Sequence, residues 1–96
     1  MVSYRLLVVD DEPLALSLIE RVFAAEADVE LRVATSPVQG LEIAERQDLD
    51  VVITDQRMPE MSGVEFLKKA REQHPDAIRL LFTGYADIRA VIDAIN

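Results

Sequence analysis

Four polar residues of this chain could take part in chemistry, because each directly follows a short apolar run. Asp10 and Asp11 follow the first run, Asp55 follows the third, and Thr83 follows the fourth. If the runs form parallel strands, the residues at their carboxyl ends meet in one crevice. Carboxylates held close together repel one another, and a divalent cation removes that cost. Oxygen ligands in a chain without cysteine favour a hard cation, so we expect a Mg²⁺ site.

Asp55 is the candidate nucleophile of this site. A carboxylate beside a bound metal can accept a phosphoryl group and form an aspartyl phosphate, which is an established covalent intermediate. The hydroxyl of Thr83 can contact a phosphoryl oxygen, and the backbone amides of residues 56–58 can donate to it as well. These residues therefore predict phosphoryl transfer onto Asp55.

The apolar pattern that must position these residues alternates between strands and helices along the chain. Such alternation predicts an α/β fold with a parallel sheet and right-handed crossovers. Alternating polar and apolar residues over 29–33 place the second strand at an edge, and the strand order 2-1-3-4 then brings the acids together. The predicted strands are residues 6–9, 29–33, 51–54 and 78–82, and the predicted helices are residues 14–25, a segment from Ser36-Pro37 onwards, a segment from Ser62 to about His74-Pro75, and 86–95.

Several local expectations accompany these elements. Asp11 or Glu12 should cap the first helix, because acidic residues suit that position. Gly63 should permit a close approach of two backbone segments, and His74 should be a solvated cation at the end of the third helix. One face of the first helix should carry its apolar stripe, which consists of Ala15, Leu18, Ile19 and Val22.

The size and charge of the chain limit its class. Its 96 residues suit one domain, taken as residues 1–96, and half of them are hydrophobic, which provides a core. The 18 acidic and 10 basic residues give a net charge of −8, which argues against direct binding of nucleic acid or of an anionic membrane. Apolar runs are far shorter than the ~20 residues that span a bilayer, and the N-terminus does not have the layout of a signal peptide. We therefore expect a soluble, cytoplasmic protein.

The acidic residues and the segments around them form a recognisable set of motifs. In chain order these are Asp10-Asp11 after a strand, Asp55-Gln56-Arg57-Met58-Pro59 with Gly63 eight residues beyond the acid, and Thr83-Gly84 after the next strand. In this combination the chain resembles a response-regulator receiver domain along its entire length. The resemblance implies a flavodoxin-like parallel sheet, and it implies that a histidine kinase or phosphotransfer protein donates a phosphoryl group to an aspartate.

The resemblance also implies a role for each matching residue. Asp55 is the phosphoacceptor. Asp11, Asp55 and the backbone carbonyl of Arg57 are the Mg²⁺ ligands, and Asp10 reaches the metal through water. Thr83 is the switch hydroxyl that moves toward the phosphoryl group. Possible modulators of the site are Gln56, Met58 and Tyr85.

The sequence departs from the family pattern after its fourth strand. Family receivers continue into a fifth strand, which carries a phosphoryl-contacting lysine and an aromatic switch residue, and then into a fifth helix. This chain stops at Asn96, and its Lys68 and Lys69 belong to the third helix instead. The edge of the fourth strand and part of the face beside the first helix are then uncovered, so we expect self-association there.

Other functional classes are weaker but remain open. A truncated receiver without the lysine could act as a dimerisation or protein-binding module that does not switch. A Mg²⁺-dependent phosphohydrolase would normally have a second acid where this chain has Arg57, and no glycine-rich turn supports a dinucleotide site. We expect no enzyme activity beyond phosphorylation and dephosphorylation of Asp55 itself.

Overall fold

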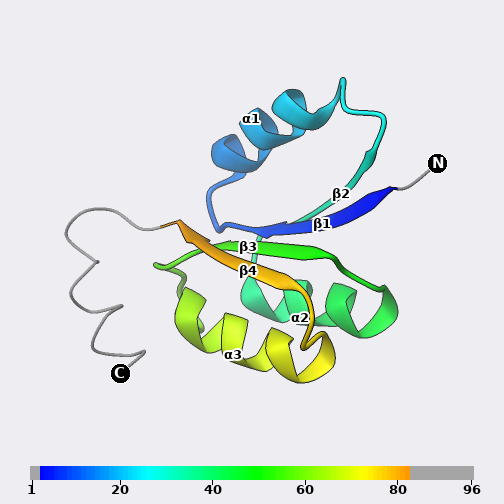
Figure 1. The fold of residues 1–96 in the computed structure, drawn as a ribbon. Helices are drawn as coiled ribbons and strands as arrows, with labels where there is room; N and C mark the ends of the chain where they lie inside the picture. Colours follow the sequence, from blue (N-terminus) through cyan, green and yellow to red (C-terminus); the bar gives the residue numbers. More distant parts are fainter. Residues whose placement is uncertain (1–2, 83–96) are drawn as a thin grey trace.

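Seven helices and strands make up residues 3–82, the part of the chain that the computed structural model describes. In chain order they are β1 (Tyr4–Val9), α1 (Pro13–Phe23), β2 (Val29–Ala34), α2 (Pro37–Arg46), β3 (Val51–Asp55), α3 (Gly63–Gln73) and β4 (Ile78–Phe82). Strands and helices alternate as predicted, as Figure 1 shows. The helix predicted over residues 86–95 lies outside the described residues.

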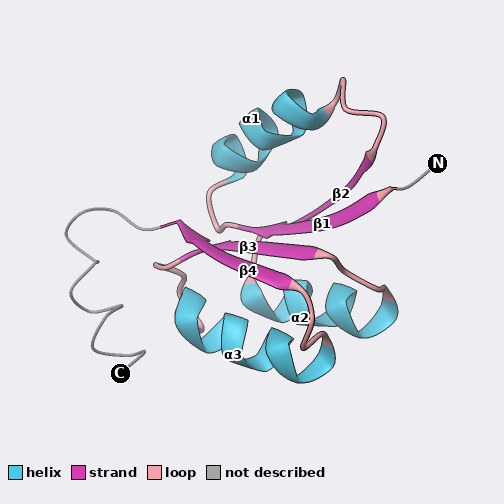
Figure 2. Ribbon diagram, in the orientation of Figure 1, coloured by secondary structure: helices cyan, strands magenta, loops and turns pink. Residues whose placement is uncertain are grey.

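The four described strands form one parallel sheet in the order β2-β1-β3-β4, which confirms the predicted order. The registers run from Leu6↔Val51 to Val9↔Thr54 between β1 and β3, with β4 beside β3. Figure 2 shows α1 on one face of the sheet and both α2 and α3 on the other. Within residues 3–82, no helix is long and apolar enough to cross a membrane.

The core consists of two apolar clusters, one on each face of the sheet. Successive side chains of a strand point to opposite faces, so residues of β1 contribute to both clusters. This explains why the continuous run in β1 is buried throughout. The cluster under α2 and α3 includes Leu7, Val9, Val52 and Phe66, and the cluster under α1 includes Leu6, Val8 and Leu16.

Helix α1 buries a different stripe from the predicted one. Leu16 is buried and packs on the sheet together with Ile19 and Phe23. Leu18 is 60% exposed and Val22 is 68% exposed, so the expectation that these two share the buried face with Ile19 was wrong. The helix carries apolar residues on two faces, and only one of them reaches the sheet.

Serine residues cap α2 and α3, and α1 follows Glu12, one of the two acidic residues expected at its N-cap. The Ser36 hydroxyl accepts a hydrogen bond from the Gln39 amide at 3.1 Å, and the Ser62 hydroxyl accepts one from the Glu65 amide at 3.2 Å. At α1 the N-cap residue is Glu12, whose side chain makes no capping hydrogen bond, and Pro13 opens the helix. Asp11 is therefore not a cap.

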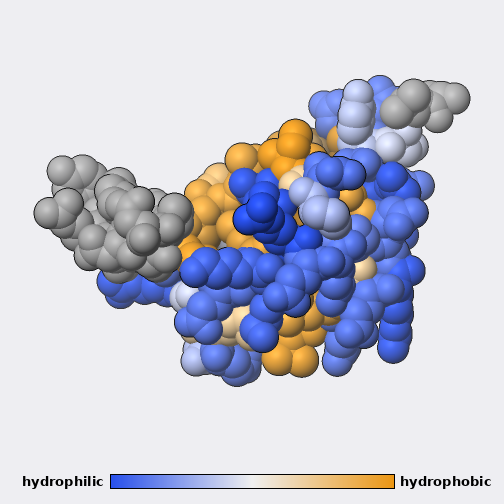
Figure 3. Space-filling view, turned by 60° about the horizontal axis from the view of Figure 1, so that its bottom comes forward, coloured by the Kyte–Doolittle hydropathy of each residue, from blue (hydrophilic) through white to orange (hydrophobic). Residues whose placement is uncertain are grey.

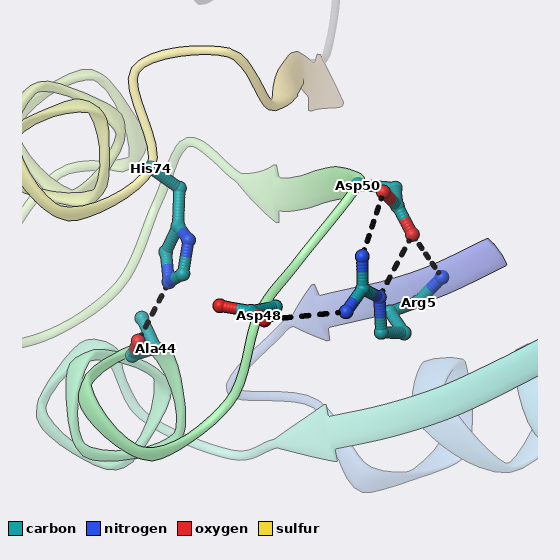
Figure 4. A network of polar contacts seen from close by, with 5 residues as sticks. All are labelled: Arg5, Ala44, Asp48, Asp50 and His74. Carbon is teal, nitrogen blue, oxygen red and sulfur yellow. Dashed lines mark hydrogen bonds and ion pairs between the residues drawn. The ribbon is translucent and has the colours of Figure 1, made fainter.

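Polar contacts hold the edge of the sheet where the strands begin (Figure 4). The Arg5 guanidinium donates to Asp50 at 3.1 Å, and the Arg5 amide donates to the same carboxylate at 2.8 Å. The side-chain hydrogen bond from Arg5 keeps the pKa of Asp50 below its ordinary value. Asp48 adds a second, more exposed ion pair to Arg5 at 3.4 Å.

His74 lies near this edge and joins two helices. Its Nε2 atom is 2.6 Å from the carbonyl oxygen of Ala44, so the end of α3 is tied to α2. The side chain is partly buried. The expectation that the His74 side chain is fully solvated was therefore wrong, because it contacts a backbone carbonyl of the neighbouring helix.

Candidate metal and phosphoacceptor site

The structure brings Asp10, Asp11 and Asp55 together at the carboxyl end of the sheet. β1 ends at Val9 and β3 ends at Asp55, and their register leaves Asp10 next to Asp55. One carboxylate oxygen from each of the three acids lies within 4.8 Å of the others. Asp10 and Asp55 are partly buried, whereas Asp11 is exposed.

Hydrogen bonds fix Asp10 at the start of the loop that follows β1. Its amide donates to the Ala34 carbonyl at 3.1 Å, which extends the contact between β1 and β2 by one residue. Its carboxylate accepts from the Glu12 amide at 2.9 Å, which closes a short turn of the kind that aspartate favours. This turn leaves Asp11 projecting into solvent beside the other two acids, where a metal ligand would be needed.

The geometry suits a small hard cation. Mg²⁺ binds oxygen at about 2.0–2.1 Å in an octahedron, so two of its ligands lie at most about 4 Å apart. The carboxylate oxygens lie within 4.8 Å of one another, so small side-chain rotations would bring them to that arrangement. Alternatively, one of the acids could reach the metal through a bridging water. The donor set is all oxygen, as such ions require.

The loop between β3 and α3 forms the other wall of the site. Asp11, Arg57, Met58 and Pro59 are among the residues that line a hollow of about 420 Å³ beside the acids. Arg57 is exposed, whereas Met58 is partly buried and packs against the core cluster under α2 and α3. Of the possible modulators, Met58 thus has a packing contact that holds the loop in place.

Gly63 allows α3 to begin directly against the end of β3, as predicted. A Cβ atom on Gly63 would collide with the backbone carbonyl oxygen of Asp55 and would lie 2.7 Å from a methyl group of Leu81. Only glycine permits this close approach, and it keeps the start of the helix beside the candidate phosphoacceptor.

The sequence treated Thr54 only as part of a strand, and it named Gln56 as a possible modulator without indicating its contacts. Thr54 is completely buried, and its hydroxyl donates to the Asp55 carbonyl at 3.0 Å. Gln56 uses both its backbone and its side chain to hold the loop, with Oε1 accepting from the Val64 amide at 3.1 Å. A polar residue next to the acid was the available signal in each case, but residue type alone does not reveal the partner.

The other two predicted site residues, Thr83 and Tyr85, lie outside the described residues. β4 is described up to Phe82, which pairs with Asp55. The end of β4 is therefore beside the candidate phosphoacceptor. The roles expected of Thr83 and Tyr85 stay predictions.

Comparisons with known proteins all point to one protein family. The chain matches the family described as the response regulator receiver domain over residues 6–96. The hydrogenase transcriptional regulatory protein HoxA of Cupriavidus necator is 39% identical over 92 residues, which cover 94% of this chain and 18% of that protein. The chain therefore spans about a fifth of the length of this curated relative.

Solved structures show the same fold. An uncharacterized protein from Neptuniibacter caesariensis is 36% identical with a TM-score of 0.90, and the match covers 100% of this chain and 71% of that one. The response regulator protein TrrA from Thermotoga maritima, solved in complex with Mg²⁺-BeF, is 32% identical with a TM-score of 0.82 over 96% of this chain and 79% of that one. These matches do not favour a non-switching binding module. This chain belongs to the response regulator receiver domains of two-component signalling.

Proposed function

We propose that Asp55 accepts a phosphoryl group from a histidine kinase or phosphotransfer protein in a reaction that requires Mg²⁺. The observation that carries this proposal is the cluster of Asp10, Asp11 and Asp55 at the carboxyl end of the sheet. Membership of the receiver family adds support, since receivers are phosphorylated on an aspartate and bind Mg²⁺ in their acidic pocket.

Each group of the site has a distinct task in this proposal. A carboxylate oxygen of Asp55 forms a bond to phosphorus while the bond from phosphorus to the donor's imidazole nitrogen breaks, and that nitrogen keeps the electron pair. Asp11, Asp55 and the Arg57 carbonyl would hold the metal, and Asp10 would reach it through water. Bound Mg²⁺ would neutralise negative charge on the phosphoryl oxygens.

The remaining groups adjust the reaction. In this proposal the Thr83 hydroxyl contacts a phosphoryl oxygen after transfer, and Tyr85 modulates access to the site. Gln56 and Met58 support the loop that holds Arg57. The chemistry of the domain is confined to phosphorylation and dephosphorylation of Asp55, so the domain regulates and does not turn over a separate substrate.

A small phosphodonor tests the proposal without the natural kinase. The protein is incubated with acetyl phosphate and Mg²⁺, and its intact mass is measured. We expect one added phosphoryl group in the wild type, and none in Asp55→Asn or with excess chelator. Asp76→Asn is the matched control, because Asp76 is an exposed acid outside the cluster. An adduct that persists in Asp55→Asn would overturn the assignment.

We also propose that the domain associates with a second copy through its exposed apolar surface. Leu14, Leu18 and Val22 are exposed on α1, and Ile78, Leu80 and Phe82 are exposed on β4. Figure 3 shows hydrophobic surface beside the grey residues that follow β4. Among the described strands, β4 pairs with β3 alone, so one of its edges can hydrogen-bond to another strand.

Sedimentation velocity over a range of concentrations tests this second proposal. We expect a weight-average mass that rises with concentration toward that of a dimer. A constant monomer mass up to high concentration would contradict it.

A further inference from the structure

Gln56, the residue after the candidate phosphoacceptor, joins three elements through three hydrogen bonds. Its amide donates to the Phe82 carbonyl at the end of β4 at 3.1 Å, and its own carbonyl accepts from the Gly63 amide at 3.0 Å. Its side-chain Oε1 accepts from the Val64 amide at 3.1 Å. Gln56 thereby connects the ends of β3 and β4 to the first turn of α3.

The first turn of α3 explains what the side chain contributes. A helix begins with four amides that have no partner inside the helix. Here two of them, from Gly63 and Val64, donate to Gln56, and a third, from Glu65, donates to the Ser62 hydroxyl. Ser62 is the ordinary local cap, whereas Gln56 lies at the opposite end of the loop. The Gln56 bonds therefore close the loop as well as cap the helix.

Closing the loop constrains Arg57, which comes directly after Gln56. The backbone and the side chain of Gln56 are both anchored, so rotation of the peptide that leads into Arg57 is restricted. An aliphatic side chain at position 56 would leave the Val64 amide without this acceptor and would release one of the two anchors. Asparagine is one methylene shorter than glutamine and would not span the same distance.

We propose that Gln56 is a positioning residue, whose side-chain oxygen holds the loop so that the Arg57 carbonyl joins Asp11 and Asp55 as a metal ligand. This inference rests on the proposed Mg²⁺-dependent phosphorylation of Asp55 and deepens it. Loss of a group that orients a metal ligand typically lowers metal affinity or activity.

The test measures the initial rate of phosphorylation by acetyl phosphate as a function of Mg²⁺ concentration. In Gln56→Met, which keeps the length of the side chain but loses the acceptor, we expect the half-saturating Mg²⁺ concentration to rise about fivefold, the equivalent of one ordinary hydrogen bond. The rate at saturating Mg²⁺ should stay within about twofold of the wild type, because the acids and the nucleophile are unchanged. If Gln56→Met does not fold, Gln56→Asn carries the same test.

Two capping variants separate positioning from a simple loss of stability. Ser36→Ala removes a capping bond of the same length, 3.1 Å, from α2, and Ser62→Ala removes one from α3 itself. Both should lower the melting temperature about as much as Gln56→Met and leave the half-saturating Mg²⁺ concentration unchanged.

Each remaining outcome has a distinct meaning. The positioning role is overturned if Gln56→Met has the same half-saturating Mg²⁺ concentration as the wild type. It is also overturned if Ser62→Ala raises that concentration as much as Gln56→Met does. In both cases the proposed function stands. A wild type that takes up no phosphoryl group would instead refute the proposed function, and the inference with it.

Discussion

Replacing Gly63 with alanine tests whether the close contact between α3 and β3 supports the site. The new Cβ would collide with the Asp55 carbonyl oxygen and lie 3.0 Å from its carbon and 2.7 Å from Leu81 Cδ1. Leu81 can rotate away, but the Asp55 carbonyl belongs to a paired strand and accepts the Thr54 hydroxyl at 3.0 Å. The backbone at the phosphoacceptor must therefore shift.

The size of the effect follows from two opposing terms. Overpacking of this kind costs about 1–3 kcal/mol, and alanine regains about 0.5–1 kcal/mol over glycine within a helix. We expect Gly63→Ala to be less stable by about 1–2 kcal/mol, and a domain of this size loses about 4–8 °C in melting temperature per kcal/mol. Thermal unfolding followed by circular dichroism measures this loss. A Mg²⁺ titration of the same variant should show weaker binding, because Asp55 moves.

Gly40→Ala is the matched control for this prediction. Its Cβ would lie 2.7 Å from Val9 and 2.9 Å from Phe66, so the collision involves core side chains instead of the backbone of the site. We expect Gly40→Ala to lose stability while it binds Mg²⁺ like the wild type. If Gly63→Ala matches the wild type in both melting temperature and Mg²⁺ affinity, the close contact between α3 and β3 does not support the site.

Three further predictions concern charge, pH and association. Asp11→Asn should weaken Mg²⁺ binding by about tenfold or more. In the presence of chelator the same variant should have a higher melting temperature than the wild type, because one of three mutually repelling carboxylates is neutralised. Hydrogen bonds from Arg5 lower the pKa of Asp50 in the folded protein. This contact therefore stabilises the fold at pH values above the unfolded pKa of about 3.9. The stabilisation is lost as the pH falls through the lower pKa of the folded state. The urea midpoints of the wild type and Asp50→Asn should accordingly differ by a constant amount near neutral pH and converge in acid; a difference that grows in acid would contradict this. Leu18→Lys combined with Leu80→Lys should lower the weight-average mass in sedimentation at high concentration, since both side chains are exposed on the proposed dimer surface; an unchanged mass would remove that surface from the interface.

The architecture and the meeting of the acids could be predicted because both follow from simple periodic rules. The short apolar run of β1 predicted a strand, and the alternation in β2 indicated an edge. Once the order β2-β1-β3-β4 is known, the residues after β1 and β3 must lie side by side. The convergence of Asp10, Asp11 and Asp55 is thus a consequence of topology.

Features that depend on tertiary contacts could not be predicted in the same way. Helix α1 has apolar residues on two faces, and periodicity does not say which face meets the sheet; Leu16 is buried while Leu18 is exposed. The contact of His74 with Ala44 spans 30 residues, so nothing local indicates it. The capping of Val64 by Gln56 crosses the loop and needs its folded shape.

Asp55 itself should carry the phosphoryl group. The most direct measurement is reduction of the phosphorylated protein with borohydride, which converts an acyl phosphate to an alcohol, followed by peptide mapping. We expect the reduced residue to be Asp55, and to appear only when both the phosphodonor and Mg²⁺ are present. Reduction at Asp10 or Asp11, or a label that does not depend on Mg²⁺, would contradict it.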